Sequence, residues 1–164
     1  DAKFFTTLTL LAMVGTYALG VFLIPKYINQ GKALRISAVL GLVFTMCILF
    51  TSGMTSILFV ASLGIANALV WPAVWPLTLQ GLGKFTKTAS ALLIMAISGG
   101  AIIPPLYGRI VDSTSQELIL SGVEKTEAIA SASTQSYWIL LPCYAIILYY
   151  AVYGHKMGLK SQTK

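Results

Sequence analysis

Long apolar runs, separated by short charged stretches, organise the chain. No Asp, Glu, Lys or Arg occurs between Ile36 and Gly83, a stretch more than twice the roughly 20 apolar residues that one α-helix needs to cross a bilayer. It predicts two membrane-spanning helices, over residues 36–52 and 56–80, joined by a turn in the sequence TSGMTS at 51–56. The same criterion predicts three further spans, over residues 4–24, 88–108 and 137–154.

The composition supports this pattern. Of the 164 residues, 57% are hydrophobic and 10% are charged, whereas a soluble domain has about 25% charged residues. A chain in lipid must satisfy its backbone hydrogen bonds internally, which helices do. The sequence therefore predicts an all-α, polytopic membrane protein with five transmembrane helices in a lipid bilayer.

The distribution of charge predicts the orientation of the helices. Basic residues near span ends stay in the cytoplasm, and one side of the predicted helices holds eight of them: Lys26, Lys32, Arg35, Lys84, Lys87, Lys156, Lys160 and Lys164. The N-terminus is then outside, the tail 155–164 is cytoplasmic, and the membrane is the inner (plasma) membrane. Topology accounts for most of the net charge of +6, so no nucleic-acid partner is needed to explain it.

The outer loop, residues 109–136, carries all of the acidic residues except Asp1. Glu117, Glu124 and Glu127 are spaced as they would be on a short amphipathic helix. A solvated loop is the favoured interpretation and the helix is the alternative.

Enzyme motifs are mostly excluded. The sequence GLGK at 81–84 resembles a phosphate-binding loop. Such a loop needs Ser or Thr at position 85 and Gly at position 78, where this chain has Phe85 and Thr78. One histidine, His155, and two distant cysteines, Cys47 and Cys143, do not make a typical zinc site. We expect no enzymatic activity, no cofactor and no metal site.

Four prolines fall inside two neighbouring predicted spans. Proline removes a backbone donor and clashes with the preceding turn, which lipid tolerates only where other helices or a water-filled cavity satisfy the freed carbonyls. Packing kinks are one interpretation, and mobile or cavity-lining segments are the other. The candidate hinge residues are these prolines and a glycine pair, namely Pro72, Pro76, Gly99, Gly100, Pro104 and Pro105.

Three side chains near the first two of these prolines form a stripe along one helix. Asn67, Trp71 and Trp75 follow one another at four-residue spacing, on one face of a helix. Indole faces suit the C–H bonds of a sugar ring, and an amide suits its hydroxyls. A bond from Asn67 to another helix, and core packing of the tryptophans, are the alternatives.

Two long segments resemble a known family. The segment NALVWPAVWPLTLQGLGKFTKTASALLIMAISGGAIIPPLYG, residues 67–108, resembles the tenth and eleventh helices of the fucose permease and glucose/galactose transporter group of the major facilitator superfamily. The segment GVFLIPKYINQGKALRISAVLGL, residues 20–42, is similar to the eighth helix of that group, the basic loop after it, and the start of the ninth helix.

This resemblance implies a secondary active transporter of a hexose or deoxyhexose sugar, driven by a proton and working by alternating access between two six-helix halves. It implies a sugar pocket formed by Asn67, Trp71 and Trp75 from the tenth helix and by Met95 and Ser98 from the eleventh. For Lys26 and Arg35 it implies a latch on the inner gate, and a plain topology signal is the alternative.

Five helices are fewer than such a transporter has. The resemblance therefore implies a partial C-terminal half, residues 1–164, whose partner is the missing N-terminal half. That half would carry the coupling carboxylates, since no acidic residue lies within a predicted span. The alternative function is a small membrane scaffold or an oligomeric channel that uses the five helices alone.

Overall fold

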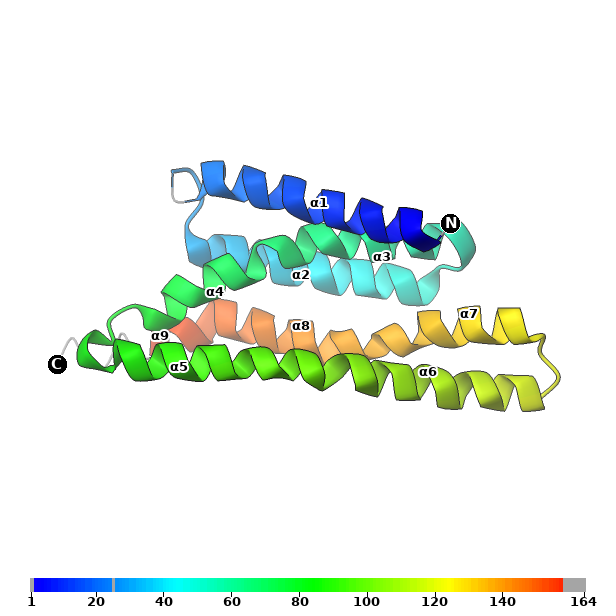
Figure 1. Cartoon of the computed structure of the whole chain (residues 1–164). Coiled ribbons are helices and arrows are strands. Elements are labelled where there is room, and N and C mark those ends of the chain that lie inside the picture. Colours follow the sequence, from blue (N-terminus) through cyan, green and yellow to red (C-terminus); the bar gives the residue numbers. More distant parts are fainter. Residues whose placement is uncertain (1, 25, 158–164) are drawn as a thin grey trace.

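Five long helical segments run side by side in the computed structural model (Figure 1). The structure describes residues 2–24 and 26–157, and throughout those residues there is no β-strand, so the predicted all-α class is confirmed. Five segments are long and apolar enough to cross a membrane, as predicted: Thr6–Leu23, Gln30–Phe50, Gly53–Leu79, Gly83–Leu120 and Lys125–Gly154.

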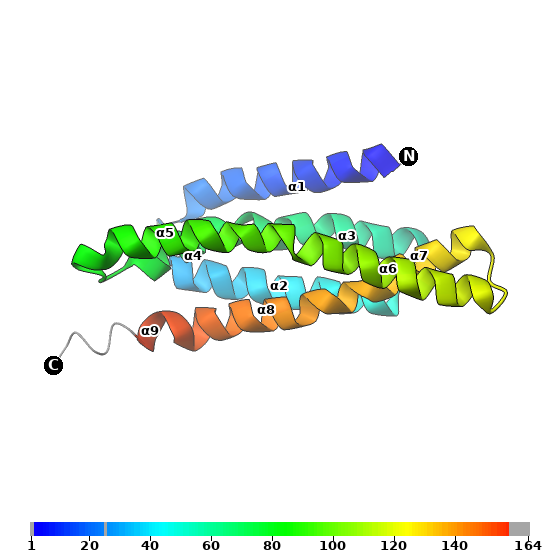
Figure 2. The ribbon, with the colours of Figure 1, turned by 60° about the horizontal axis from the view of Figure 1, so that its bottom comes forward.

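Several of these segments consist of more than one helix. In chain order the elements are α1 (Ala2–Leu23), α2 (Gln30–Phe50), α3 (Gly53–Ala68), α4 (Val70–Leu79), the 3₁₀ turn η1 (Gly83–Phe85), α5 (Thr86–Ala96), the 3₁₀ turn η2 (Ile97–Ala101), α6 (Ile103–Leu120), α7 (Lys125–Gln135), the 3₁₀ turn η3 (Ser136–Ile139), α8 (Leu140–Tyr149), the π-helical turn η4 (Tyr150–Gly154) and α9 (His155–Met157). The α2–α3 and α6–α7 turns lie at one end of the bundle, and the α4–α5 turn lies at the other (Figures 1 and 2).

The second span begins earlier than residue 36. Asn29 caps α2, and its side-chain Oδ1 accepts a hydrogen bond from the Gly31 amide at 3.0 Å. A capping side chain satisfies an amide that the first helical turn leaves unpaired. Lys32 and Arg35 therefore lie on the helix, because a charge ends the apolar stretch without ending the helix.

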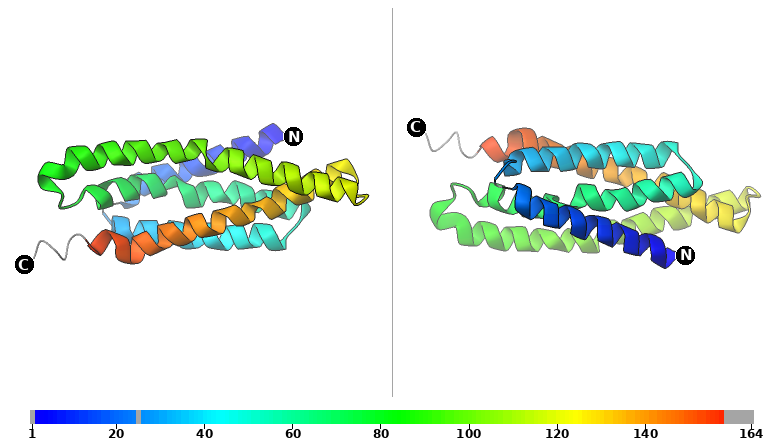
Figure 3. Two further views of the ribbon diagram at one scale, coloured as in Figure 1. Left: turned by 90° about the horizontal axis from the view of Figure 1, so that it is seen from below. Right: turned by 90° about the horizontal axis from the view of Figure 1, so that it is seen from above.

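The solvated loop favoured for residues 109–136 is wrong, and the helical alternative is confirmed, as two helices instead of one. Residues 109–120 continue α6, and residues 125–135 form α7. No Gly or Pro occurs between Arg109 and Leu120, so nothing breaks the helix where the apolar stretch stops. The turn comes only at residues 121–124, where Gly122 adopts φ 95°, a conformation that glycine reaches without strain. The resulting α6–α7 hairpin projects beyond the ends of α2 and α3 (Figure 3).

The start of α7 shows how this hairpin is fixed. Glu124 is its N-cap residue, and the Thr126 hydroxyl donates to Glu124 Oε1 at 2.9 Å. That hydrogen bond is the largest cause that holds the pKa of this fully exposed carboxyl below its usual range, and hydrogen bonds from nearby backbone amides lower the pKa further. A carboxylate at a helix N-terminus also interacts favourably with the helix dipole.

Helix α2 is the centre of the bundle, since it packs against α3, α4 and α8. Two apolar clusters line it. One contains Leu34 with Ala73, Leu77 and Ala151, and the other contains Ile48 with Leu63 and Tyr144.

Arg35 joins α2 to the π-helical turn η4. Its Nε donates to the carbonyl oxygen of the buried Ala151 at 3.0 Å. Tyr150, in the same turn, shares a 2.7 Å hydrogen bond with the Thr78 hydroxyl of α4. The structure thus gives Arg35 a contact within the bundle, which is independent of the latch and topology roles considered from the sequence.

Helix α1 packs closely against α3 and the residue after it at two glycines, Gly64 and Gly20. A Cβ added at Gly64 would lie 2.6 Å from the backbone oxygen of Thr9, and one added at Gly20 would collide with the side chain of Leu69. Small residues allow such close helix contacts in membranes.

We therefore expect Gly64→Ala to loosen this interface. The added methyl group meets backbone, which cannot rotate away, and overpacking of this kind costs about 1–3 kcal/mol. The thermal midpoint of the detergent-solubilised protein, followed by size-exclusion chromatography, should fall. Gly15→Ala on α1 is the matched control, because a Cβ there meets nothing within 4 Å. Equal midpoints for the two variants would contradict the contact.

Candidate functional site

The third span is interrupted where its prolines predict a break. Helix α3 ends at Ala68, Leu69 forms a turn at φ −99° and ψ −4°, and α4 begins at Val70. Pro72 has no N–H to bond the carbonyl oxygen of Ala68, four residues earlier. Pro76 lies inside α4. A hinge role for the two prolines remains a prediction.

The two tryptophans lie together just after this break. The ring centroids of Trp71 and Trp75 are 5.6 Å apart, with their planes tilted by 54°. Trp71 is 44% exposed, whereas Trp75 is half-buried. Part of the Trp71 indole is therefore accessible at the surface of the bundle, next to the ring of Trp75.

Asn67 lies on the other side of the break, in the last turn of α3. Its side-chain Oδ1 accepts a hydrogen bond from the Tyr144 hydroxyl of α8 at 2.9 Å. The expected alternative of a bond to another helix is thus made. The residue is nevertheless exposed, and in the described part of the chain no acceptor is hydrogen-bonded to its Nδ2.

Met95 and Ser98 lie on the next span, at the end of α5 and in η2. Met95 is 67% exposed, and the exposed Ser98 donates to the carbonyl oxygen of Met95, at 2.6 Å. No residue in the most apolar stretch of the span Gly83–Leu120 is buried by the rest of the described chain. Both side chains therefore lie on an open surface, and a site that they share with the tryptophans remains a prediction.

The remaining hinge candidates lie within η2 and in the helix that follows it. Gly99 and Gly100 lie within this 3₁₀ turn, and Pro104 and Pro105 occupy the first turn of α6. A Cβ at either glycine would meet nothing within 4 Å. These glycines therefore do not pack tightly against another helix within the described residues.

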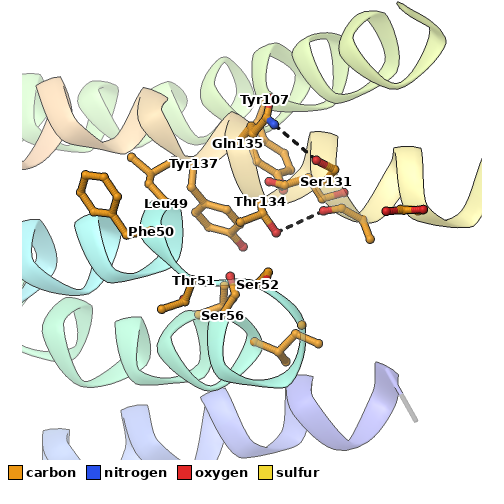
Figure 4. A pocket seen from close by; sticks show the side chains of 16 residues that line it. Leu49, Phe50, Thr51, Ser52, Ser56, Tyr107, Ser131, Thr134, Gln135 and Tyr137 are labelled. Atoms are coloured by element: carbon orange, nitrogen blue, oxygen red, sulfur yellow. Dashed lines mark hydrogen bonds between the residues drawn. The ribbon is translucent and has the colours of Figure 1, made fainter. Parts of the chain in front are cut away.

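A cavity lies elsewhere, at the end of the bundle that holds the α2–α3 turn. It measures about 760 Å³. Figure 4 shows Thr51, Ser52 and Ser56 facing Thr134 and Tyr137 across it. Tyr107 also lines it and donates to the carbonyl oxygen of Ser133 at 3.0 Å. None of the predicted sugar-pocket residues lines this cavity.

The sequence analysis missed Tyr144 altogether. The side chain is 3% exposed and reaches from α8 to Asn67 on α3. A tyrosine at the middle of a predicted span was the available signal, because a buried phenol usually finds a hydrogen-bond partner. Among the described residues, no three His, Cys, Asp or Glu side chains gather as metal ligands would.

Similarity to characterised proteins covers most of the chain. It is 29% identical over 145 residues to a glucose/galactose transporter of Brucella abortus, and 31% identical over the same length to a putative glucose/galactose transporter of Helicobacter pylori. Each match covers 88% of this chain. An L-fucose-proton symporter of Haemophilus influenzae is 29% identical over 112 residues, or 68% of the chain.

The matches cover much less of the relatives. The chain spans about a third of the transporters from Brucella and Helicobacter, at 31% and 32% of their lengths, and 23% of the Haemophilus symporter. No protein-family model matches the chain, and no solved structure is significantly similar to it. Over most of its length the chain is a relative of the fucose permease and glucose/galactose transporter group of the major facilitator superfamily.

Proposed function

We propose that this chain is part of a secondary active transporter for a hexose or deoxyhexose sugar. The observation that carries the proposal is the similarity, over 88% of the chain, to proteins named glucose/galactose transporters. Five helices able to cross a membrane are consistent with it. A non-enzymatic role agrees with the names of these relatives.

The proposed sugar site is made of Asn67, Trp71 and Trp75, together with Met95 and Ser98. Asn67, Trp71, Met95 and Ser98 are all exposed. A transporter of the length of these relatives has further helices to cover such surfaces, and we propose that they belong to an N-terminal half and complete the site. The chain itself would then be a partial C-terminal half, residues 1–164.

Alternating access requires segments that can bend. We propose that Pro72, Pro76, Pro104 and Pro105 shape two such segments, and that Gly99 and Gly100 provide the hinge between α5 and α6. The open space around both glycines supports this, because no side chain blocks a change in their backbone angles.

Proton coupling is the second part of the proposal. Asp112, Glu117 and Glu127 lie on the α6–α7 hairpin, outside the predicted spans 88–108 and 137–154. Charged residues in the apolar core of a bilayer usually mark ion pathways, and the spans predicted from the sequence contain no carboxylate. The coupling carboxylates are therefore assigned to the N-terminal half. The proposed location is the inner (plasma) membrane, with the N-terminus outside and the C-terminus in the cytoplasm.

The function is tested by uptake of labelled sugars into cells that express the complete transporter. A panel of hexoses and deoxyhexoses, with and without a proton uncoupler, should show concentrative uptake of at least one sugar, which the uncoupler abolishes. Uptake that persists with the uncoupler would contradict proton coupling alone. No uptake of any sugar would contradict the transport function.

The scaffold or channel alternative is not favoured, because the relatives are named as transporters and symporters. The two are distinguished by reconstituting residues 1–164 in liposomes. A transporter segment should give no ion conductance, whereas an oligomeric channel should conduct.

A further inference from the structure

Tyr144 connects three helices at the middle of the bundle. It belongs to α8, packs with Ile48 of α2 and Leu63 of α3, and is almost completely buried. Its hydroxyl leaves this apolar cluster and donates to Asn67 Oδ1 at 2.9 Å. Its phenol is therefore held by packing at the ring and by a hydrogen bond at the tip.

The ring can occupy this position only because of Gly41. A Cβ added at Gly41 would collide with the ring of Tyr144. One helical turn after Gly41, the hydroxyl of the fully buried Thr45 donates to the Gly41 carbonyl oxygen at 2.7 Å. Thr45 therefore does not donate to the Tyr144 phenol. The surroundings thus fix the direction in which the Tyr144 hydroxyl points.

This hydrogen bond determines which end of the Asn67 amide faces Tyr144 and which end faces outward. An asparagine side chain carries one acceptor oxygen and an NH₂ group with two donors. The phenol occupies the oxygen, so the two N–H groups of Nδ2 are the ones left to face outward from this exposed residue. A fixed amide costs less ordering on binding than a freely rotating one.

We propose that Tyr144, seated on Gly41, is a positioning residue that makes Asn67 a hydrogen-bond donor towards the transported sugar. The site then selects a sugar with an acceptor oxygen, in a hydroxyl or in the ring, at the position that meets Nδ2. This inference rests on the proposed function and adds to it which partner, Asn67 or the sugar, donates the hydrogen bond between them. Asn67 touches the sugar, whereas Tyr144 acts through Asn67.

The test measures transport kinetics of the complete protein for the best sugar of the panel and for its monodeoxy analogues. The wild type should discriminate against the analogue that lacks the contacted oxygen. Tyr144→Phe keeps the ring and removes the hydroxyl, so KM for the parent sugar should rise about two- to tenfold, as expected for one neutral hydrogen bond. Discrimination at that single position should shrink, while the maximal rate stays within about twofold of the wild type. Tyr149→Phe, on the exposed side of α8, is the matched control.

Two further variants separate positioning from a general structural effect. Asn67→Asp retains an oxygen for Tyr144 but has no N–H groups, so it should lose the same discrimination. In the Asn67→Ala background, Tyr144→Phe should add no further loss, because residues that act through one another are not additive. Gly41→Ala should reproduce the Tyr144→Phe phenotype, and the phenylalanine variant decides the question if the alanine variant does not fold.

The outcomes are distinct. Absence of uptake by the wild type would overturn the proposed function and this inference with it. Normal wild-type discrimination that Tyr144→Phe leaves unchanged would overturn the positioning role alone. Full discrimination by Asn67→Asp would overturn the donor assignment, since the amide would then be acting through its oxygen.

Discussion

Asn67→Ala in the complete transporter is expected to reduce the ratio of maximal rate to KM for sugar uptake by about ten- to a hundredfold. The substitution removes the only amide of the proposed site, so a sugar oxygen that is desolvated on binding loses its hydrogen-bond partner. A buried polar group without a partner costs about 1–3 kcal/mol, and each 1.4 kcal/mol corresponds to about tenfold in affinity. The hydroxyl of the buried Tyr144 also loses its acceptor, which lowers the stability of the fold.

Uptake and surface expression should be measured on the same cells, because insertion into the membrane should be unchanged. Gln116→Ala is the control. Its side chain is an exposed amide on the α6–α7 hairpin, away from the proposed site. Normal uptake by Asn67→Ala at normal expression would remove Asn67 from the sugar pocket.

Trp71→Ala is expected to raise KM for the sugar about tenfold or more. The indole of Trp71 is 44% exposed, and its ring neighbour Trp75 stays in place. Contact between a sugar ring and an indole removes on the order of 60 Å² of apolar surface from water, which is about 1.5 kcal/mol.

Trp138→Ala controls for the general loss of a tryptophan. Trp138 lies in η3 and is 53% exposed, at a predicted membrane interface, so KM should not change. A tenfold effect of both substitutions, or of neither, would contradict a specific role for Trp71 in binding.

The number and class of the helices could be predicted because hydropathy depends on local sequence alone. Runs of about 20 apolar residues correspond to membrane-spanning helices whatever surrounds them. Pro72 likewise predicted a break, since the missing N–H acts only four residues away. Both features are independent of tertiary contacts.

The ends of the helices could be predicted less well, because hydropathy marks the membrane and hydrogen bonding marks the helix. Asn29 starts α2 before the apolar stretch begins, and α6 continues to Leu120 after that stretch ends. Charged residues at these positions lie on helix that extends past the apolar stretches. The error at 109–136 has this origin.

The contacts of the candidate site could not be predicted from local sequence. Tyr144 and Asn67 are 77 positions apart, and their hydrogen bond depends on the free space above Gly41 in a third helix. The pairing of Trp71 with Trp75 was accessible, because four-residue spacing on a helix brings side chains together.

The central claim is that the exposed face of α4 borders a water-filled passage in which a sugar binds. It is tested most directly by Trp71→Cys in the complete transporter, after Cys47 and Cys143, which are free thiols, have been replaced. A membrane-impermeant thiol reagent is applied to intact cells, and the same variant in detergent gives the full extent of labelling. The account predicts that the introduced thiol reacts in intact cells and that the transported sugar slows the reaction. A thiol that reacts only after detergent is added, or at a rate that the sugar does not change, would contradict it.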